Sequence, residues 1–280
     1  MKELSNLYIS HYSDTPESIV PLTGSASNRK YFRLSGGGHS CIGVVGTDAR
    51  ENEAFLTIAE HFRAKGINVP EVYAVSEDMM AYIQEDLGDA VLFDMLAKAR
   101  KAGEGLEEVE VLLRKTMSML PKIQFEGADG LDFSVCYPQP SFDRRMVMFD
   151  LNYFKYCFMK PSGLEFDEVL LQDDFDKLAD DLLVSDTDTF LYRDFNARNV
   201  MIKDGEPYFV DFQGGRRGPV FYDVASFAWQ ARAMFTEDQK EMMLKAYMDA
   251  YSQYSRSHAP SAGVPVSVLE SAQLCRSLVK

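Results

Sequence analysis

The stretch LYRDFNARNVMI spans residues 191–202, and YFVDFQGG follows it at residues 208–215 after the turn Lys203-Asp204-Gly205-Glu206. Short apolar runs on both sides of that turn predict two strands that pair as a hairpin. Three polar side chains lie in or beside these strands, namely those of Asp194, Asn199 and Asp211. The stretch therefore predicts a loop and a hairpin that present two carboxylates and one amide together.

An Asp, an Asn five residues later and a second Asp after a hairpin suit phosphoryl transfer. That reaction needs a base near the attacking hydroxyl and oxygen ligands that hold Mg²⁺ on the phosphates. We predict that Asp194 accepts the hydroxyl proton and that Asn199 and Asp211 bind the metal. Because a lone acidic residue in a turn is common, this prediction depends on the three residues together.

The composition narrows the class of protein. With 280 residues, 46% of them hydrophobic, the chain can bury a sizeable core. Its formal net charge of −14 argues against a nucleic-acid partner, since a polyanion would be repelled. The four cysteines are scattered without a CxxC pair, so neither a zinc site nor a disulfide framework is indicated. No apolar run is long enough to cross a bilayer, and we expect a cytoplasmic protein without a membrane partner.

Hydrophobic periodicity divides the chain into a strand-rich first part and a helical second part. Strands are expected at 18–22, 30–34, 41–45, 71–76 and 80–85, with helices at 4–12 and 51–65. Further helices are expected at 91–102, 106–124, 142–159, 167–183, 223–233 and 237–254. A last helix at 267–280 has no terminating Gly or Pro, which is compatible with a chain that continues beyond it. The expected fold class is α+β.

Three motifs carry a resemblance to a known family: LTGSASNRKYFRL at 22–34, IQEDLGD at 83–89 and DFQGGRRGPVFYD at 211–223. With the loop and hairpin above, they resemble the aminoglycoside phosphotransferase and choline kinase superfamily over nearly the whole chain. Within it, they are most similar to the anomeric kinases of N-acetylmuramate and N-acetylglucosamine that act in cell-wall sugar recycling.

The resemblance implies a bilobal protein-kinase-like fold that binds ATP and Mg²⁺ between its lobes. Residues 1–88 would form the nucleotide-binding lobe, and residues 89–280 the catalytic and acceptor-binding lobe. The loop between the first two strands would cover the phosphates with small residues, Gly24, Ser25, Ala26 and Ser27. The backbone of the hinge would bind the adenine at Gln84, Glu85 and Asp86.

One departure from the family concerns the third strand, Cys41-Ile42-Gly43-Val44-Val45, which lacks the lysine that normally binds the α and β phosphates. Arg29, Lys30 and Arg33 are the candidates for a substitute. Strand alternation places Arg29 and Arg33 on one face and Lys30 on the other. The acid that orients this cation would be Glu51 or Glu53, although a solvated helix face also explains either.

Acceptor contacts are expected from the helical part. Asp143 and Asp150 lie seven residues apart on one predicted helix face, where charges are often only solvated. Arg198 and Arg216 lie close to the catalytic motif and would neutralise the transferring phosphate, or simply pair with nearby acids. Asp223, at a helix start, is expected to brace the catalytic loop beside Arg193.

The sequence thus predicts an ATP-dependent kinase that phosphorylates a hydroxyl, with the anomeric hydroxyl of an N-acetylated amino sugar as first candidate. Another small alcohol, such as an aminoglycoside or choline, is a nearer alternative. A catalytically silent kinase-like module that binds a nucleotide or a partner is a more distant one, suggested by the missing lysine and opposed by the retained Asp194, Asn199 and Asp211.

Overall fold

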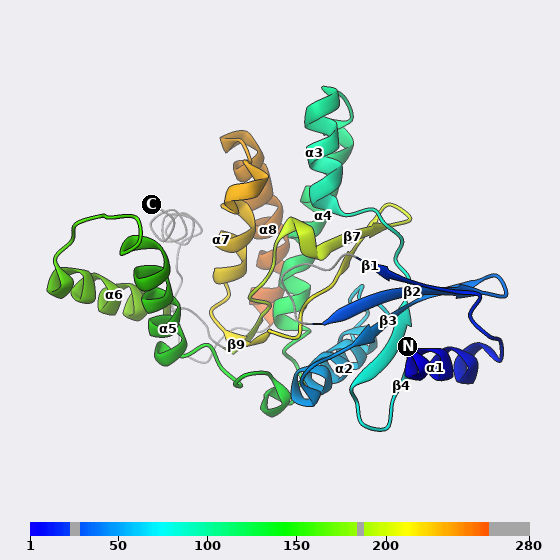
Figure 1. The fold of residues 1–280 in the computed structure, drawn as a ribbon. Helices are drawn as coiled ribbons and strands as arrows, with labels where there is room; N and C mark the ends of the chain where they lie inside the picture. The colour runs from blue at the N-terminus through cyan, green and yellow to red at the C-terminus, as the bar shows by residue number, and fades with distance from the viewer. Residues whose placement is uncertain (23–28, 184–187, 258–280) are drawn as a thin grey trace.

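The structure is a computed structural model that describes residues 1–22, 29–183 and 188–257. These residues form a β-rich lobe and a larger, mainly helical lobe (Figure 1). The predicted bilobal α+β architecture is therefore confirmed. Gly24, Ser25, Ala26, Ser27 and the helix expected at 267–280 lie outside the described residues.

The first lobe is built on one antiparallel sheet of five strands in the order β1-β2-β3-β5-β4. Alternating apolar residues and short turns produce these strands close to where the sequence predicts them. Their bounds are Ser18–Leu22 for β1, Lys30–Gly36 for β2, His39–Val45 for β3, Val72–Val75 for β4 and Ala81–Glu85 for β5.

Helices cover both faces of this sheet. Helix α1 (Lys2–Tyr12) packs on one face through Leu4 and Tyr8, and α2 (Ala49–Ala64) packs on the other. Gly43 of β3 permits the close approach of α1, because a Cβ there would lie 2.6 Å from Leu34 Cδ1 and 2.9 Å from Leu4 Cδ1. The glycine in the third strand therefore has a packing role.

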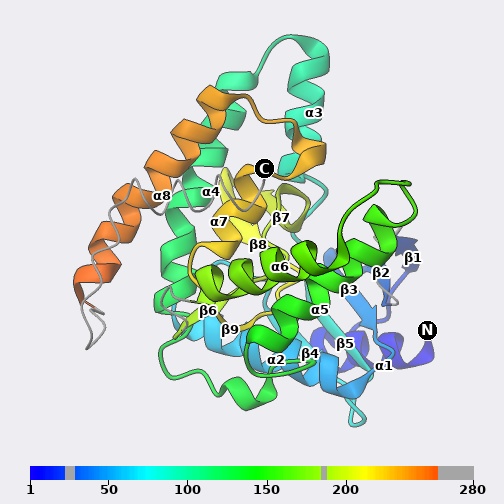
Figure 2. The same ribbon diagram turned by 90° about the vertical axis from the view of Figure 1, so that its left-hand side faces the viewer.

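The second lobe consists mainly of helices, with α4 and α8 side by side (Figure 2). Helices α5 and α6 project from the side away from the sheet and share a small core of their own (Figure 1). No helix among the described residues is long and apolar enough to span a membrane. The bounds are Leu92–Ala102 for α3, Leu106–Phe125 for α4, Arg144–Phe154 for α5, Glu168–Leu183 for α6, Tyr222–Ala228 for α7 and Glu237–Ser257 for α8.

Two short ribbons carry the motif residues. Strands β7 (Val200–Lys203) and β8 (Glu206–Phe209) form the predicted hairpin, and β6 (Thr189–Leu191) pairs with β9 (Arg216–Gly218). Asp204 and Gly205 adopt positive φ values of 53° and 75°, which suit a two-residue hairpin turn.

The β7–β8 hairpin also contacts the first lobe and the segment after β5. The Ile202 N–H donates to the carbonyl of Ala90 at 2.7 Å, and the Phe209 N–H donates to the carbonyl of Asn68 at 2.8 Å. The ammonium of Lys203 pairs with the carboxylate of Glu85. The lobes are therefore joined by lateral contacts as well as by the chain.

The structure corrects three boundaries. The helix expected at 142–159 ends at Phe154 and continues as a π-helical turn, Lys155–Met159. The helix expected at 223–233 is interrupted, with α7 ending at Ala228 and a 3₁₀ turn at Ala231–Ala233. Strand β9 was not predicted, because its sequence Arg-Arg-Gly has no apolar alternation.

Candidate active site

The loop after β6 brings the three motif residues together. The Asn199 amide nitrogen donates to the Asp194 carbonyl at 2.8 Å and to Asp211 Oδ2 at 3.3 Å. Asp194 itself is exposed on the loop, with its carboxylate beside the backbone of Gly214. The predicted clustering of Asp194, Asn199 and Asp211 is thus present in the structure.

Asn199 and Asp211 present oxygen atoms that fit a divalent cation. Because the Asn199 nitrogen bonds to two acceptors, its amide oxygen is the atom left to a metal. Gln213 Nε2 holds Asp211 Oδ1 at 2.7 Å, which fixes the carboxylate. Among the described residues no group of three or more His, Cys, Asp or Glu side chains would hold a metal. Mg²⁺ would therefore need phosphate or water oxygens as further ligands, as is usual for this ion.

Asp223 braces the backbone of the catalytic loop, as predicted. It is fully buried, and its two carboxylate oxygens accept from the N–H groups of Tyr192 at 2.7 Å and Arg193 at 2.9 Å. Burial raises the pKa of Asp223 to about 7. The brace places Arg193 in a left-handed conformation, φ 74°, immediately before Asp194.

The electrostatic surroundings of Asp194 favour a role as base. Although Asp194 reaches the surface, partial loss of solvation by the surrounding protein raises the pKa of its carboxyl above the ordinary value, and the negative charge of Asp211 raises it further. The positive charges of Arg193 and Arg216 act in the opposite direction. A carboxylate with a raised pKa is a stronger proton acceptor, which suits general-base work.

One cavity of about 390 Å³ lies between the lobes and contains the predicted hinge. Its apolar walls come from both lobes and include Ile42, Val91 and Met201. Asn199 and Asp211 line one part of it, and Gln84, Glu85 and Asp86 line another. The predicted hinge and metal residues therefore belong to a single cavity.

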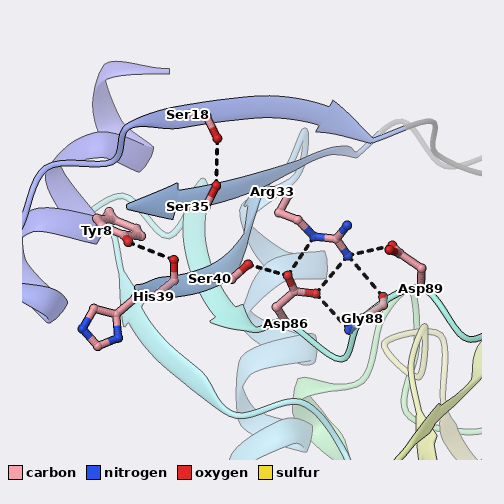
Figure 3. A network of polar contacts seen from close by, with 9 residues as sticks. All are labelled: Tyr8, Ser18, Arg33, Ser35, His39, Ser40, Asp86, Gly88 and Asp89. Carbon is pink, nitrogen blue, oxygen red and sulfur yellow. Dashed lines mark hydrogen bonds and ion pairs between the residues drawn. The ribbon is translucent and has the colours of Figure 1, made fainter. Parts of the chain in front are cut away.

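The two candidate arginines for nucleotide binding have different partners. Arg33 reaches the hinge, where it donates to Asp86 at 2.7 Å and to Asp89 at 2.8 Å, and Ser40 also donates to Asp86 (Figure 3). Arg29 is buried and pairs with Glu51 of α2 at 3.3 Å. Lys30, the third candidate, is exposed.

The Arg29–Glu51 pair and Asp211 lie near the same two tyrosines, Tyr31 and Tyr82. Burial is the main cause of the raised pKa of both phenols. The positive charge of Arg29 lowers the pKa of each, and the negative charges of Glu51 and Asp211 raise it. Arg29 directly precedes β2, so this ion pair joins the start of that strand to α2, which covers the sheet.

A second cavity of about 320 Å³ lies between α5, α6 and α7. Its walls are mainly apolar, with the aromatic rings of Tyr222 and Trp229 and one carboxylate, that of Asp150. Both Asp150 oxygens accept from Arg193, at 2.9 and 3.0 Å. The pKa of Tyr222 rises to about 12, mainly through burial, and the charge of Asp194 contributes to the rise. The cavity therefore lies near the catalytic loop.

The remaining predicted residues have diverse positions. Arg198 lines the cavity between the lobes. Arg216 is 2% exposed and donates to the carbonyls of Gly214 and Tyr137, so its guanidinium is turned inward. Asp143 caps α5 by accepting from the Met146 N–H at 3.0 Å. Arg216 and Asp143 thus have backbone partners, and their substrate contacts stay predictions.

Sequence reasoning missed three residues around the site. Gln213 fixes Asp211, and Tyr222 and Trp229 line the second cavity. Gln213 lies two residues after Asp211 within a quoted motif, so its position was a usable signal. Trp229 is the single tryptophan of the chain and follows α7, but only the tertiary structure places it against α5 and α6.

Two curated relatives match most of this chain at low sequence identity. The chain is 28% identical over 262 residues to an N-acetylmuramate/N-acetylglucosamine kinase of Neisseria meningitidis serogroup B. The aligned region covers 90% of this chain and 71% of the relative. The chain is 25% identical over 238 residues to a kinase of the same name from Pseudomonas aeruginosa, covering 83% of this chain and 65% of the relative. The chain therefore spans about two thirds of the length of these relatives.

Solved structures show the same fold. A choline kinase from Cryptosporidium parvum superposes with a TM-score of 0.59 at 10% identity, covering 93% of this chain and 78% of that one. The streptomycin–ATP ternary complex of APH(2")-IIa superposes with a TM-score of 0.58 at 12% identity, covering 89% and 87%. The phosphotransferase enzyme family matches residues 18–261. The chain thus has the protein-kinase-like fold and belongs to the phosphotransferase enzyme family, as an enzyme that phosphorylates an alcohol group.

Proposed function

We propose that this enzyme transfers the γ-phosphate of ATP to the anomeric hydroxyl of an N-acetylated amino sugar. The observation that carries the proposal is the clustering of Asp194, Asn199 and Asp211, with Asn199 and Asp211 on the wall of the cavity between the lobes. The names of the curated relatives, which are kinases of N-acetylmuramate and N-acetylglucosamine, favour an amino sugar as acceptor.

The nucleotide would occupy the cavity between the lobes, with residues 1–88 as the nucleotide lobe. The backbone of residues 84–86 would bind the adenine, and Arg29, oriented by Glu51, would bind the phosphates in place of the absent lysine. Arg33 is less suited to this role because Asp86 and Asp89 already neutralise it. Its predicted contact with nucleotide would be made at the hinge.

Transfer requires little covalent help from the protein. Asp194 would accept the proton of the acceptor hydroxyl while the oxygen of that hydroxyl forms a bond to the γ-phosphorus. The bond between the γ-phosphorus and the β–γ bridging oxygen breaks, and ADP is released. Asn199 and Asp211 would hold Mg²⁺, which withdraws charge from the phosphates when bound. Arg198, on the same cavity, would offset charge on the transferring group.

The acceptor would enter through the second cavity, within the lobe formed by residues 89–280. The rings of Tyr222 and Trp229 offer apolar faces of the kind on which a sugar ring packs, and Asp150 adds an acceptor at the wall. A cationic aminoglycoside would leave most of its charges without partners there, because Asp150 is the one charged side chain among the described residues that line this cavity. This composition favours a neutral or weakly charged acceptor.

The proposal is tested by ATP consumption with Mg²⁺ and N-acetylmuramate, N-acetylglucosamine, choline or kanamycin. We expect turnover with one of the amino sugars, and its loss by about a thousandfold or more in Asp194→Asn. Asp204→Asn is the matched control, since Asp204 is exposed in the β7–β8 turn and Asn also adopts positive φ. Turnover with kanamycin or choline alone would overturn the sugar assignment. Nucleotide binding without turnover on any acceptor would instead favour a silent module.

A further inference from the structure

Gln84 is a buried polar residue on the wall of the cavity between the lobes. It is the penultimate residue of β5 and pairs with Ile42 of β3 and Val72 of β4. Its side chain is 8% exposed and lines the cavity together with Ile42. The hinge backbone that follows it has been assigned to adenine binding, but the amide side chain has no role so far.

The Gln84 side chain lacks an internal partner. Its Oε1 atom is buried and forms no hydrogen bond with any residue that the structure describes. Leaving such a group unpaired costs about 1–3 kcal/mol, and most buried polar atoms in proteins are paired. Because Gln84 lines the cavity, a rotation of its amide would turn this unpaired oxygen toward a group that enters the cavity.

The other polar side chains at the hinge already have partners. Arg33 is held by Asp86 and Asp89 (Figure 3), and Glu85 is held by Lys203. Among the described residues that line this end of the cavity, Gln84 is thus the polar side chain left to meet a ligand. The apolar side chains of Leu22, Ile42 and Met201 complete a slot that suits a flat ring.

We infer that the Gln84 amide reads the N6/N7 edge of the nucleobase and thereby selects adenine over guanine. A glutamine amide accepts from the adenine N6 amine and donates to N7, so it pairs with both atoms at once. Guanine presents two acceptors, O6 and N7, at the same edge, and the amide oxygen then faces no donor. The inference rests on the proposed nucleotide site and adds to it the side chain that selects the base.

The test is nucleotide binding by isothermal titration calorimetry with Mg²⁺ and no acceptor, so that turnover is not needed. The ligands are ATP, GTP and 7-deaza-ATP, in which a C–H replaces N7. Gln84→Met keeps the length of the side chain and removes its polar atoms. Gln172→Met is the matched control, because Gln172 lies on α6 outside both cavities.

The wild type and Gln172→Met should bind ATP about ten- to a hundredfold more tightly than GTP. Gln84→Met should weaken ATP binding by about tenfold and leave GTP binding nearly unchanged. The wild type should bind 7-deaza-ATP several-fold more weakly than ATP. Gln84→Met should bind 7-deaza-ATP and ATP with the same affinity.

The inference is overturned if the ratio of ATP affinity to GTP affinity is the same in Gln84→Met and in the wild type. It is also overturned if replacing ATP by 7-deaza-ATP weakens binding by the same factor in both proteins. Either result would leave the kinase proposal intact, since ATP would still bind. If the wild type binds neither nucleotide, the proposed function fails together with the inference.

Discussion

The two cavities of this enzyme are built in different ways. The cavity between the lobes is lined by charged residues that are held in pairs, Arg33 with Asp86 and Glu85 with Lys203. The second cavity is mainly apolar, and its helices α5 and α6 pack through a small core that is separate from the main one. Hydrogen bonds fix direction, whereas apolar packing tolerates changes of shape at constant volume. Under the proposed assignment of the second cavity to the acceptor, this contrast would keep the catalytic residues in place and let acceptor preference vary.

The largest effect should follow from Asp223→Ala, which removes the brace of the catalytic loop. The N–H groups of Tyr192 and Arg193 lose their acceptor, so we expect the free energy of unfolding to fall by about 2–5 kcal/mol. Turnover should fall as well. Chemical denaturation measures the first effect. Asp180→Ala on α6, where Asp180 pairs with Arg144 at the surface, should cost less than about 1 kcal/mol. Equal losses of unfolding free energy in Asp223→Ala and Asp180→Ala would show that the buried carboxylate is no more important for stability than the surface one.

Asp223 should also make stability depend on pH. Its pKa is raised to about 7 in the folded protein, so the folded state binds more protons than the unfolded state between about pH 4 and pH 7. The protonated Asp223 carboxyl therefore adds to the free energy of unfolding. This contribution is fully present below about pH 4 and is lost as the pH rises to about 7. Asp223→Asn cannot ionise, and the difference in unfolding free energy between wild type and variant should shift against the wild type over this range. A constant difference would contradict the assigned pKa.

Arg29→Met should affect the nucleotide side alone. We expect kcat/KM for ATP to fall by about ten- to a hundredfold, with the KM of the acceptor unchanged, because the pair with Glu51 belongs to the β-rich lobe and not to the second cavity. Steady-state kinetics with each substrate varied in turn measures the split. Arg29→Lys should recover part of the loss. If Arg33→Met is the variant that loses ATP affinity, the assignment of the phosphate-binding cation is wrong.

Trp229→Leu should affect the opposite side and by a smaller factor. Trp229 lines the second cavity, so the KM of the acceptor should rise by about tenfold while the KM of ATP stays the same. The same two-substrate kinetics provides the measurement. A rise in the KM of ATP would show that the two cavities are not independent.

Local chemistry explains why much of the fold was predictable. The bounds of β1 match the prediction, and β7 and β8 form the predicted hairpin, because alternating side chains and turn residues act over a few positions. The clustering of Asp194, Asn199 and Asp211 was predictable for the same reason, since one hairpin joins Asn199 and Asp211.

Features that depend on distant contacts were not predictable. The sequence offered Arg29 and Arg33 equally, and only the packing of α2 and the hinge assigns Glu51 to the first and Asp86 to the second. The second cavity likewise forms from helices far apart in sequence. The π-helical turn after Phe154 has no signal that we recognise in the sequence.

The contacts between the β7–β8 hairpin and the first lobe constrain how the enzyme opens. Ile202 is bonded to Ala90, Phe209 to Asn68, and Lys203 to Glu85. These contacts hold residues 85–90 against the hairpin, whose two ends carry Asn199 and Asp211. A rotation of the first lobe away from the hairpin would break the contacts of Phe209 with Asn68 and of Lys203 with Glu85, whereas Ile202 and Ala90 lie in the same lobe and would stay together.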